Sequence, residues 1–264
     1  MASETVFVDT GTARLRVQLD GPASAPPLMF SNSLGAALEM WDAQAEAFAP
    51  QRRVIRYDVR GHGKSTCPLG TWSLADLAQD ALRIMDHLGY PRVDWVGCSM
   101  GGMTGMHLLT HHRERLGKAV LGNTSAFMGL PDTDWNARIA SARENGMDAL
   151  AEAMKLRWFT ARCNAENPAE VTRVTDMVRN AALEGYIGCA CAIRDMDQRE
   201  SIKTISNPVL VLIGVQDPAT PPAHGELMAR AIPGALTAYV DAAHISNCEA
   251  PQAYNAAIAP FLLS

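Results

Sequence analysis

The most reactive arrangement in the sequence is a serine at the tip of a predicted turn. Ser99 lies at the centre of Gly97-Cys98-Ser99-Met100-Gly101, a G-x-S-x-G pattern between an apolar run and a predicted helix. Glycines at both ends let the chain turn sharply and hold the serine hydroxyl exposed in a strained conformation. The first N–H groups of the following helix favour negative charge that develops nearby. This pattern predicts a serine nucleophile.

A serine nucleophile needs a general base and an acid that orients it. After this type of turn the chain order is serine, acid, histidine. Among seven histidines, His244 fits best because it follows the last predicted strand. Asp217 follows the preceding strand and is expected to orient the imidazole. The alternative acids are Asp241, three residues before the histidine, and Asp195 or Asp197 farther upstream.

An oxyanion hole for this nucleophile needs two backbone donors. The N–H of Met100 is the first, and the loop after an early strand supplies the second. In that loop we expect the N–H of Ser33, with Leu34 as the alternative. His62 lies in a glycine-rich turn and is expected to fix its loop by hydrogen bonding.

Short apolar runs alternate with helical patterns and must position these groups. Near-continuous runs such as residues 209–213 are typical of strands buried on both faces of a parallel sheet. The first two runs flank a turn at 9–12 and predict an antiparallel hairpin. The predicted strands are 5–8, 14–19, 27–31, 53–58, 93–97, 119–122, 209–214 and 237–240. We therefore expect an α/β fold with helices on both faces of the sheet.

Helical periodicity fills the gaps between these strands. Ser73 is a candidate N-cap for a helix over 73–88, and Gly89 is its stop signal. Between about 125 and 206 helical patterns follow one another without a strand, a stretch too long for an ordinary crossover. We expect a helical cap over 126–204, inserted between core segments 1–125 and 205–264. The predicted helices are 38–48, 73–88, 100–112, 134–145, 147–158, 168–180, 183–196, 223–231 and 251–262.

Composition excludes several classes of protein. The chain has 264 residues, with 23 Lys and Arg against 28 Asp and Glu, and a net charge of −5. A mildly acidic chain without a basic run is a poor ligand for nucleic acid or anionic membranes. It has no apolar run long enough to span a bilayer and no signal-peptide pattern. Six cysteines without C-x-x-C spacing indicate reduced thiols in the cytoplasm rather than disulfides or a metal site. We expect no cofactor, no metal and no obligate protein partner.

Four features resemble the α/β-hydrolase superfamily along the whole chain. They are residues 97–102 (Gly-Cys-Ser-Met-Gly-Gly), residues 58–65 (Asp-Val-Arg-Gly-His-Gly-Lys-Ser), Asp217 and His244. The resemblance implies the α/β-hydrolase fold, with a mostly parallel eight-stranded sheet and a helical cap. It also implies a Ser99–Asp217–His244 triad that works through an acyl-enzyme.

Within that superfamily, the sequence of one loop points to a narrower group. Residues 31–35 (Ser-Asn-Ser-Leu-Gly), followed by Met-Trp-Asp at 40–42, resemble the 3-oxoadipate enol-lactonases. Most members of the superfamily carry His-Gly-x-x-Gly in this loop. The resemblance implies hydrolysis of an enol-lactone to 3-oxoadipate in the β-ketoadipate pathway of aromatic-compound catabolism.

A lactone of this kind carries a carboxylate, so its pocket should offer a cation. Trp135 and Arg138 lie three residues apart on one face of a cap helix. We expect Trp135 to wall the pocket and Arg138 to bind the carboxylate; a packed tryptophan beside a solvated arginine is the alternative. Other functions share the triad: a general small-ester carboxylesterase or perhydrolase, a carbon–carbon bond hydrolase, and a ligand-sensing receptor.

Overall fold

An eight-stranded sheet crosses the molecule in the order β1-β2-β4-β3-β5-β6-β7-β8. The structure, a computed structural model, describes residues 3–129, 131 and 133–264. Strand β2 pairs antiparallel with β1 and β4, and every other pair is parallel. The predicted mostly parallel sheet is thereby confirmed. The strands are β1 (Glu4–Asp9), β2 (Arg14–Asp20), β3 (Pro27–Ser31), β4 (Arg53–Tyr57), β5 (Val93–Cys98), β6 (Leu116–Gly122), β7 (Val209–Gly214) and β8 (Leu236–Val240).

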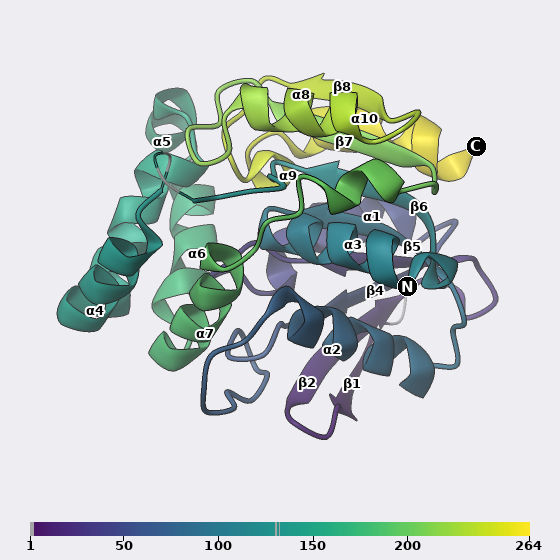
Figure 1. Cartoon of the computed structure of the whole chain (residues 1–264), viewed down its shortest axis with the longest axis horizontal. Coiled ribbons are helices and arrows are strands. Elements are labelled where there is room, and N and C mark those ends of the chain that lie inside the picture. The colour runs from purple at the N-terminus through teal and green to yellow at the C-terminus, as the bar shows by residue number, and fades with distance from the viewer. Residues whose placement is uncertain (1–2, 130, 132) are drawn as a thin grey trace.

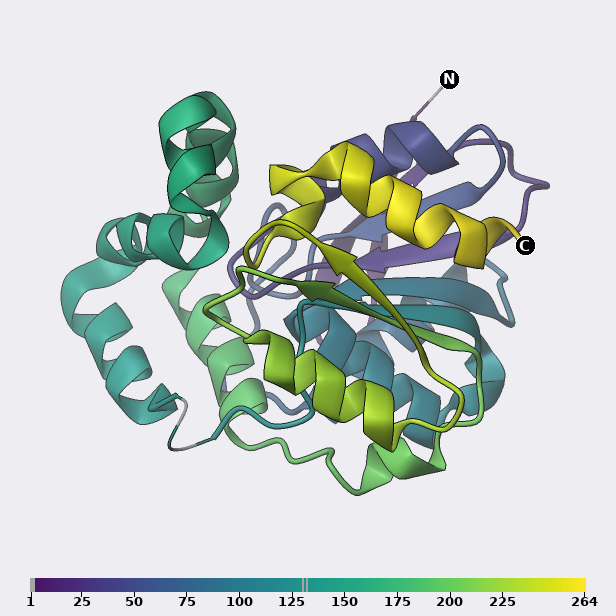
Figure 2. The ribbon, with the colours of Figure 1, turned by 90° about the horizontal axis from the view of Figure 1, so that it is seen from above.

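Helices cover both faces of this sheet. Figure 2 shows α1 and α10 on one face and α3 and α8 on the other. All six residues of β7 are buried between these layers, which explains its continuous apolar sequence. The helices are η1 (Leu38–Trp41), α1 (Asp42–Phe48), α2 (Leu74–His87), α3 (Met100–His111), η2 (Arg113–Arg115), α4 (Trp135–Trp158), α5 (Ala161–Glu166), α6 (Pro168–Arg179), α7 (Leu183–Arg194), η3 (Ser201–Thr204), α8 (Pro222–Ala231), α9 (Ser246–Glu249) and α10 (Pro251–Leu263).

Helix α2 begins and ends where its sequence signals predict. The hydroxyl of Ser73 accepts from the Asp76 N–H, and the Asp76 carboxylate accepts from the Ser73 N–H, which forms a capping box. Gly89 follows the helix with φ 75°, the left-handed conformation that suits a glycine stop.

Helices α4 to α7 stand to one side of the sheet, between β6 and β7 in the chain (Figure 1). The helices predicted over 134–145 and 147–158 are joined into one, α4, which is kinked at Gly146. There φ is 74° and ψ is −178°, so two helical arms meet at an angle. An isolated bridge between Phe127 and Asp197 ties together the segments that enter and leave this helical region. The domain boundaries 126 and 204 stay a prediction.

All six cysteines are free. Within residues 3–129, 131 and 133–264 no helix is long and apolar enough to cross a membrane. Over the same residues no group of three or more His, Cys, Asp or Glu side chains is arranged to hold a metal ion.

Candidate active site

Ser99 lies in the turn between β5 and α3, at the carboxyl end of the sheet. Its φ of 54° is a conformation that residues other than glycine rarely adopt. The Ser99 N–H donates to the Gly122 carbonyl (3.0 Å), and the Thr124 hydroxyl donates to the Ser99 carbonyl (2.7 Å). Gly122 at the end of β6 and Thr124 just after it therefore hold the strained turn through the N–H and the carbonyl of Ser99.

Two glycines permit this turn. A Cβ at Gly97 would collide with the carbonyl of Gly101, and a Cβ at Gly101 would collide with the carbonyl of Ser31. Both collisions involve backbone, so no side-chain movement could relieve them. The Gly101 N–H donates to the Asn32 carbonyl at 3.0 Å. The start of α3 is consequently fixed against the loop after β3.

His244 and Asp217 form a buried hydrogen-bonded pair. His244 Nδ1 lies 2.8 Å from Asp217 Oδ2, and each residue is only 3% exposed. Because a carboxylate contacts Nδ1, the neutral imidazole carries its proton there and leaves Nε2 as an acceptor. His244 and Ser99 line the same cavity. The structure thus brings together the predicted serine, histidine and acid; their roles in catalysis are proposed below.

Asp217 receives more hydrogen bonds than the sequence predicted. The N–H groups of Ala219 and Thr220 donate to Oδ1 at 2.7 and 2.9 Å. The Thr220 hydroxyl (2.7 Å) and the Asn123 amide (3.1 Å) donate to Oδ2. Burial by itself would raise the pKa of Asp217, but the His244 charge and the bonds from His244 and Thr220 lower it below its usual value. Sequence analysis missed Thr220 and Asn123, although a polar residue directly after β6 was a usable signal.

The alternative acids lie apart from His244's ring. Asp241 is exposed and accepts a hydrogen bond from Gln216 at 2.6 Å. Asp195 and Asp197 are also exposed, and each forms an ion pair with a neighbouring arginine. Among the four acids considered, the structure therefore pairs His244 with Asp217.

The motif at 58–65 holds the loop that carries the candidate oxyanion donors. The Leu38 N–H donates to Asp58 Oδ1 (2.8 Å), and the Gly35 N–H donates to His62 Nε2 (2.9 Å). Ser33 lies between β3 and these two anchors and lines the cavity beside Ser99. Met100 is the first residue of α3, so its N–H has no acceptor within the helix. The N–H groups of Ser33 and Met100 stay the candidate oxyanion hole.

His62 is a buried histidine whose geometry requires a neutral ring. Nδ1 lies 3.0 Å from the Arg60 carbonyl and must donate, so Nε2 accepts from Gly35. Burial lowers the pKa of His62, and the bond to the Arg60 carbonyl only partly opposes this. The stabilising effect of the neutral ring is complete above about pH 6.5, the ordinary histidine pKa, and declines as pH falls below it.

Replacing His62 should therefore impair catalysis while the Ser99 hydroxyl stays in place. We expect His62→Phe to lower kcat about tenfold, because an unsatisfied Gly35 N–H costs about 1–3 kcal/mol and loosens the oxyanion loop. His62→Gln, whose amide oxygen can accept from Gly35, should retain more activity and lose less stability between pH 7 and pH 5 than wild type. Steady-state kinetics and urea unfolding at both pH values check this. Equal kcat for wild type and His62→Phe would contradict it.

The cavity beside Ser99 reaches into the helical region and is narrow. Its volume is about 30 Å³, enough for one or two waters, so a larger ligand must displace side chains. Trp135 and Arg138 both line it, as the sequence predicted for their positions. Trp135 Nε1 donates to the Met128 carbonyl (2.7 Å), and the Arg138 guanidinium lies 4.8 Å from the centre of the Trp135 ring. Sequence analysis missed Arg157, which lines the same cavity from the second arm of α4.

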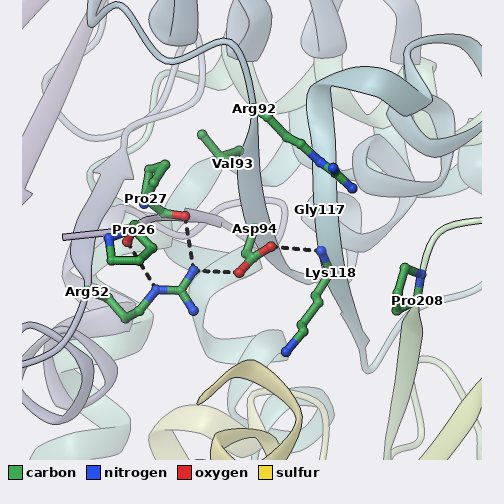
Figure 3. Close-up of a pocket in the computed structure, with 9 residues that line it drawn as sticks. All are labelled: Pro26, Pro27, Arg52, Arg92, Val93, Asp94, Gly117, Lys118 and Pro208. Atoms are coloured by element: carbon green, nitrogen blue, oxygen red, sulfur yellow. Dashed lines mark hydrogen bonds and ion pairs between the residues drawn. The ribbon is translucent and has the colours of Figure 1, made fainter. Parts of the chain in front are cut away.

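A larger groove of about 410 Å³ lies at the opposite end of the sheet, where β3, β5 and β6 begin. Figure 3 shows Arg52 reaching across it to the Pro26 and Pro27 carbonyls and to Asp94. The other oxygen of Asp94 accepts from the Lys118 N–H at 2.7 Å. These groups satisfy one another, so their role in the structure is to hold the strand ends together.

Comparison with known proteins agrees with this geometry. A family model described as alpha/beta hydrolase fold matches residues 26–251. The chain belongs to the α/β-hydrolase family. This α/β hydrolase is 38% identical over 255 residues to 3-oxoadipate enol-lactonase 2 of Acinetobacter baylyi, covering 96% of the chain and 95% of the relative. It is 34% identical to 3-oxoadipate enol-lactonase 1 of the same organism, covering 91% and 90%.

Solved structures are similar over the same length. The enol-lactonase from Burkholderia xenovorans LB400 superposes on this α/β hydrolase with a TM-score of 0.94, at 38% identity. The match covers 99% of this chain and 100% of that one. The protein is therefore a hydrolytic enzyme with enol-lactonases among its relatives.

Proposed function

We propose that this hydrolase opens the lactone ring of 3-oxoadipate enol-lactone and releases 3-oxoadipate. One observation carries the proposal: the cavity that joins Ser99 and His244 also contains Arg138, for which the described residues provide no carboxylate partner. A neutral ester would leave this guanidinium without a counter-charge, whereas the lactone carries one carboxylate. Relatives named 3-oxoadipate enol-lactonase support the choice. In this proposal the enzyme acts in the cytoplasm on a small molecule, without nucleic acid, membrane or obligate protein partner.

The proposed reaction follows from the positions of five groups. Ser99 Oγ attacks the lactone carbonyl while His244 Nε2 takes the hydroxyl proton, and Asp217 stabilises the resulting imidazolium. The N–H groups of Ser33 and Met100 donate to the oxyanion. The ring C–O bond breaks, the enol oxygen takes the proton from His244, and an acyl-enzyme remains. His244 then deprotonates a water, which attacks the acyl carbon. The acyl carbon–Oγ bond breaks, His244 returns the proton to Ser99 Oγ, and the new carboxylic acid loses its proton to water. The released enol tautomerises to the ketone of 3-oxoadipate.

Arg138 is held in place for the substrate carboxylate. Its Nε donates to the Tyr186 hydroxyl at 2.7 Å, and its guanidinium plane lies over the Trp135 ring. These contacts fix the side chain before a ligand binds, which lowers the ordering cost of binding.

Removing the Arg138 charge should weaken binding of the charged lactone selectively. We expect Arg138→Gln to raise KM for 3-oxoadipate enol-lactone about 10- to 100-fold, because a charge-assisted bond contributes about 1.5–3 kcal/mol. KM for a neutral lactone of the same ring size should change less than threefold. Steady-state kinetics with both substrates measure this difference. Equal effects on both substrates, or faster turnover of neutral esters by the wild type, would favour a general small-ester carboxylesterase.

A further inference from the structure

The cavity contains a second cation beyond the one that a monocarboxylate needs. Arg138 comes from the first arm of α4 and Arg157 from the second, and the kink at Gly146 lets both arms face one cavity. Arg138 uses Nε for Tyr186 and one Nη for the Met154 sulfur (3.6 Å). Burial, followed by the charge of Arg138, lowers the pKa of Arg157, so the two guanidinium groups lie close enough to repel each other.

Both arginines differ from those that the core buries. Each of four buried arginines has an Asp or Glu partner: Arg16, Arg52, Arg56 and Arg60. Within the described part of the chain, neither Arg138 nor Arg157 forms an ion pair with a carboxylate. The carboxylate whose charge raises the pKa of Arg157 is Asp217, which is already bonded to His244 and Thr220. The cavity therefore holds two positive charges that its own side chains leave unmatched.

We propose that this cavity is a two-cation site whose preferred ligand is a linear dicarboxylate, so that the enzyme is inhibited by such dianions, including its own product. This proposal rests on the proposed function for the identity of the natural dianion. The lactone brings one carboxylate for Arg138, and hydrolysis creates a second at the Ser99 carbonyl position. Arg157 and Arg138 both line the cavity that contains Ser99, Thr220 and His244, so the new carboxylate forms in a space that two guanidinium groups share.

Direct binding measurements test this without any turnover. By isothermal titration calorimetry of the whole enzyme at pH 7.5 and fixed ionic strength, adipate should bind at least about tenfold more tightly than hexanoate. The two ligands have equal chain length and differ by one charge, and 1,6-hexanediol gives the uncharged reference. Arg157→Gln should reduce adipate affinity to that of hexanoate. Arg162→Gln changes an exposed arginine in α5 and should leave the tenfold preference intact.

The wild-type comparison alone decides the proposal even if a variant fails to fold. Equal affinities for adipate and hexanoate would overturn it, and so would a folded Arg157→Gln protein that keeps the preference. Lactone kinetics separate the two proposals. Dicarboxylate selectivity without turnover of the enol-lactone would overturn the proposed function only, whereas turnover without selectivity would overturn the two-cation site only.

Discussion

Ser99→Ala is expected to lower kcat for lactone hydrolysis about 10⁶-fold, to a rate set by the oxyanion donors and substrate binding alone. Without the hydroxyl no acyl-enzyme can form, and His244 has no proton to accept. The substitution should leave the fold intact. The φ of 54° at this position is held by backbone hydrogen bonds to Gly122 and Thr124, which alanine retains. Rates from purified protein and melting temperature by calorimetry measure both effects.

A matched serine-to-alanine control lies at the start of α2. Ser73→Ala removes the N-cap of α2, and Ser73 does not line the cavity beside Ser99. It should cost about 1 kcal/mol, or about 2–4 °C in melting temperature, with kcat unchanged. If Ser99→Ala kept more than a hundredth of wild-type kcat, Ser99 would not be the nucleophile.

Asp217→Asn is expected to lower kcat about 10⁴-fold, because an amide can donate to His244 Nδ1 and so favours the tautomer that protonates Nε2. In the wild type the pKa of Asp217 lies below its usual value. The carboxylate therefore stays ionised at neutral pH, and its stabilising effect is present above about pH 4 and lost as pH falls further. Because asparagine does not titrate, the free energy of unfolding of the Asn variant should fall less than that of the wild type between pH 7 and pH 3. Urea unfolding over this range measures the difference.

Asp241→Asn makes the same change at the nearest alternative acid. Within the described residues the Asp241 carboxylate bonds to Gln216 alone, and Asp241 is exposed. Its loss should change kcat less than threefold. A large loss at Asp241 together with a small one at Asp217 would assign the acid to the other carboxylate.

Local sequence patterns predicted the parts of the site that are local in the chain. The glycines around Ser99 predicted the turn because backbone collisions at Gly97 and Gly101 leave no room for another residue. The order of strands predicted Asp217 and His244 because both follow strands whose carboxyl ends meet at one edge. The apolar runs likewise predicted all eight strands within a few residues.

Other parts depend on contacts that no short pattern contains. Helix α5 has only six residues, too few to show a helical period. Asn123 and Thr220 acquire their roles because β6, β7 and the His244 loop meet in space. Arg157 and Arg138 line the same cavity because α4 is kinked between them. Helical periodicity predicts each arm separately and does not predict the angle between the arms.

The kink at Gly146 allows ligand binding to change separately from the core of the protein. A Cβ there would meet no atom within 4 Å, so the glycine is required by its backbone angle and not by packing. Substitutions near this kink can change the spacing of the two guanidinium groups while the core, with the proposed nucleophile and base, stays as it is. Ligand preference in this enzyme can therefore diverge through the shape of one helix, without any change to Ser99, Asp217 or His244.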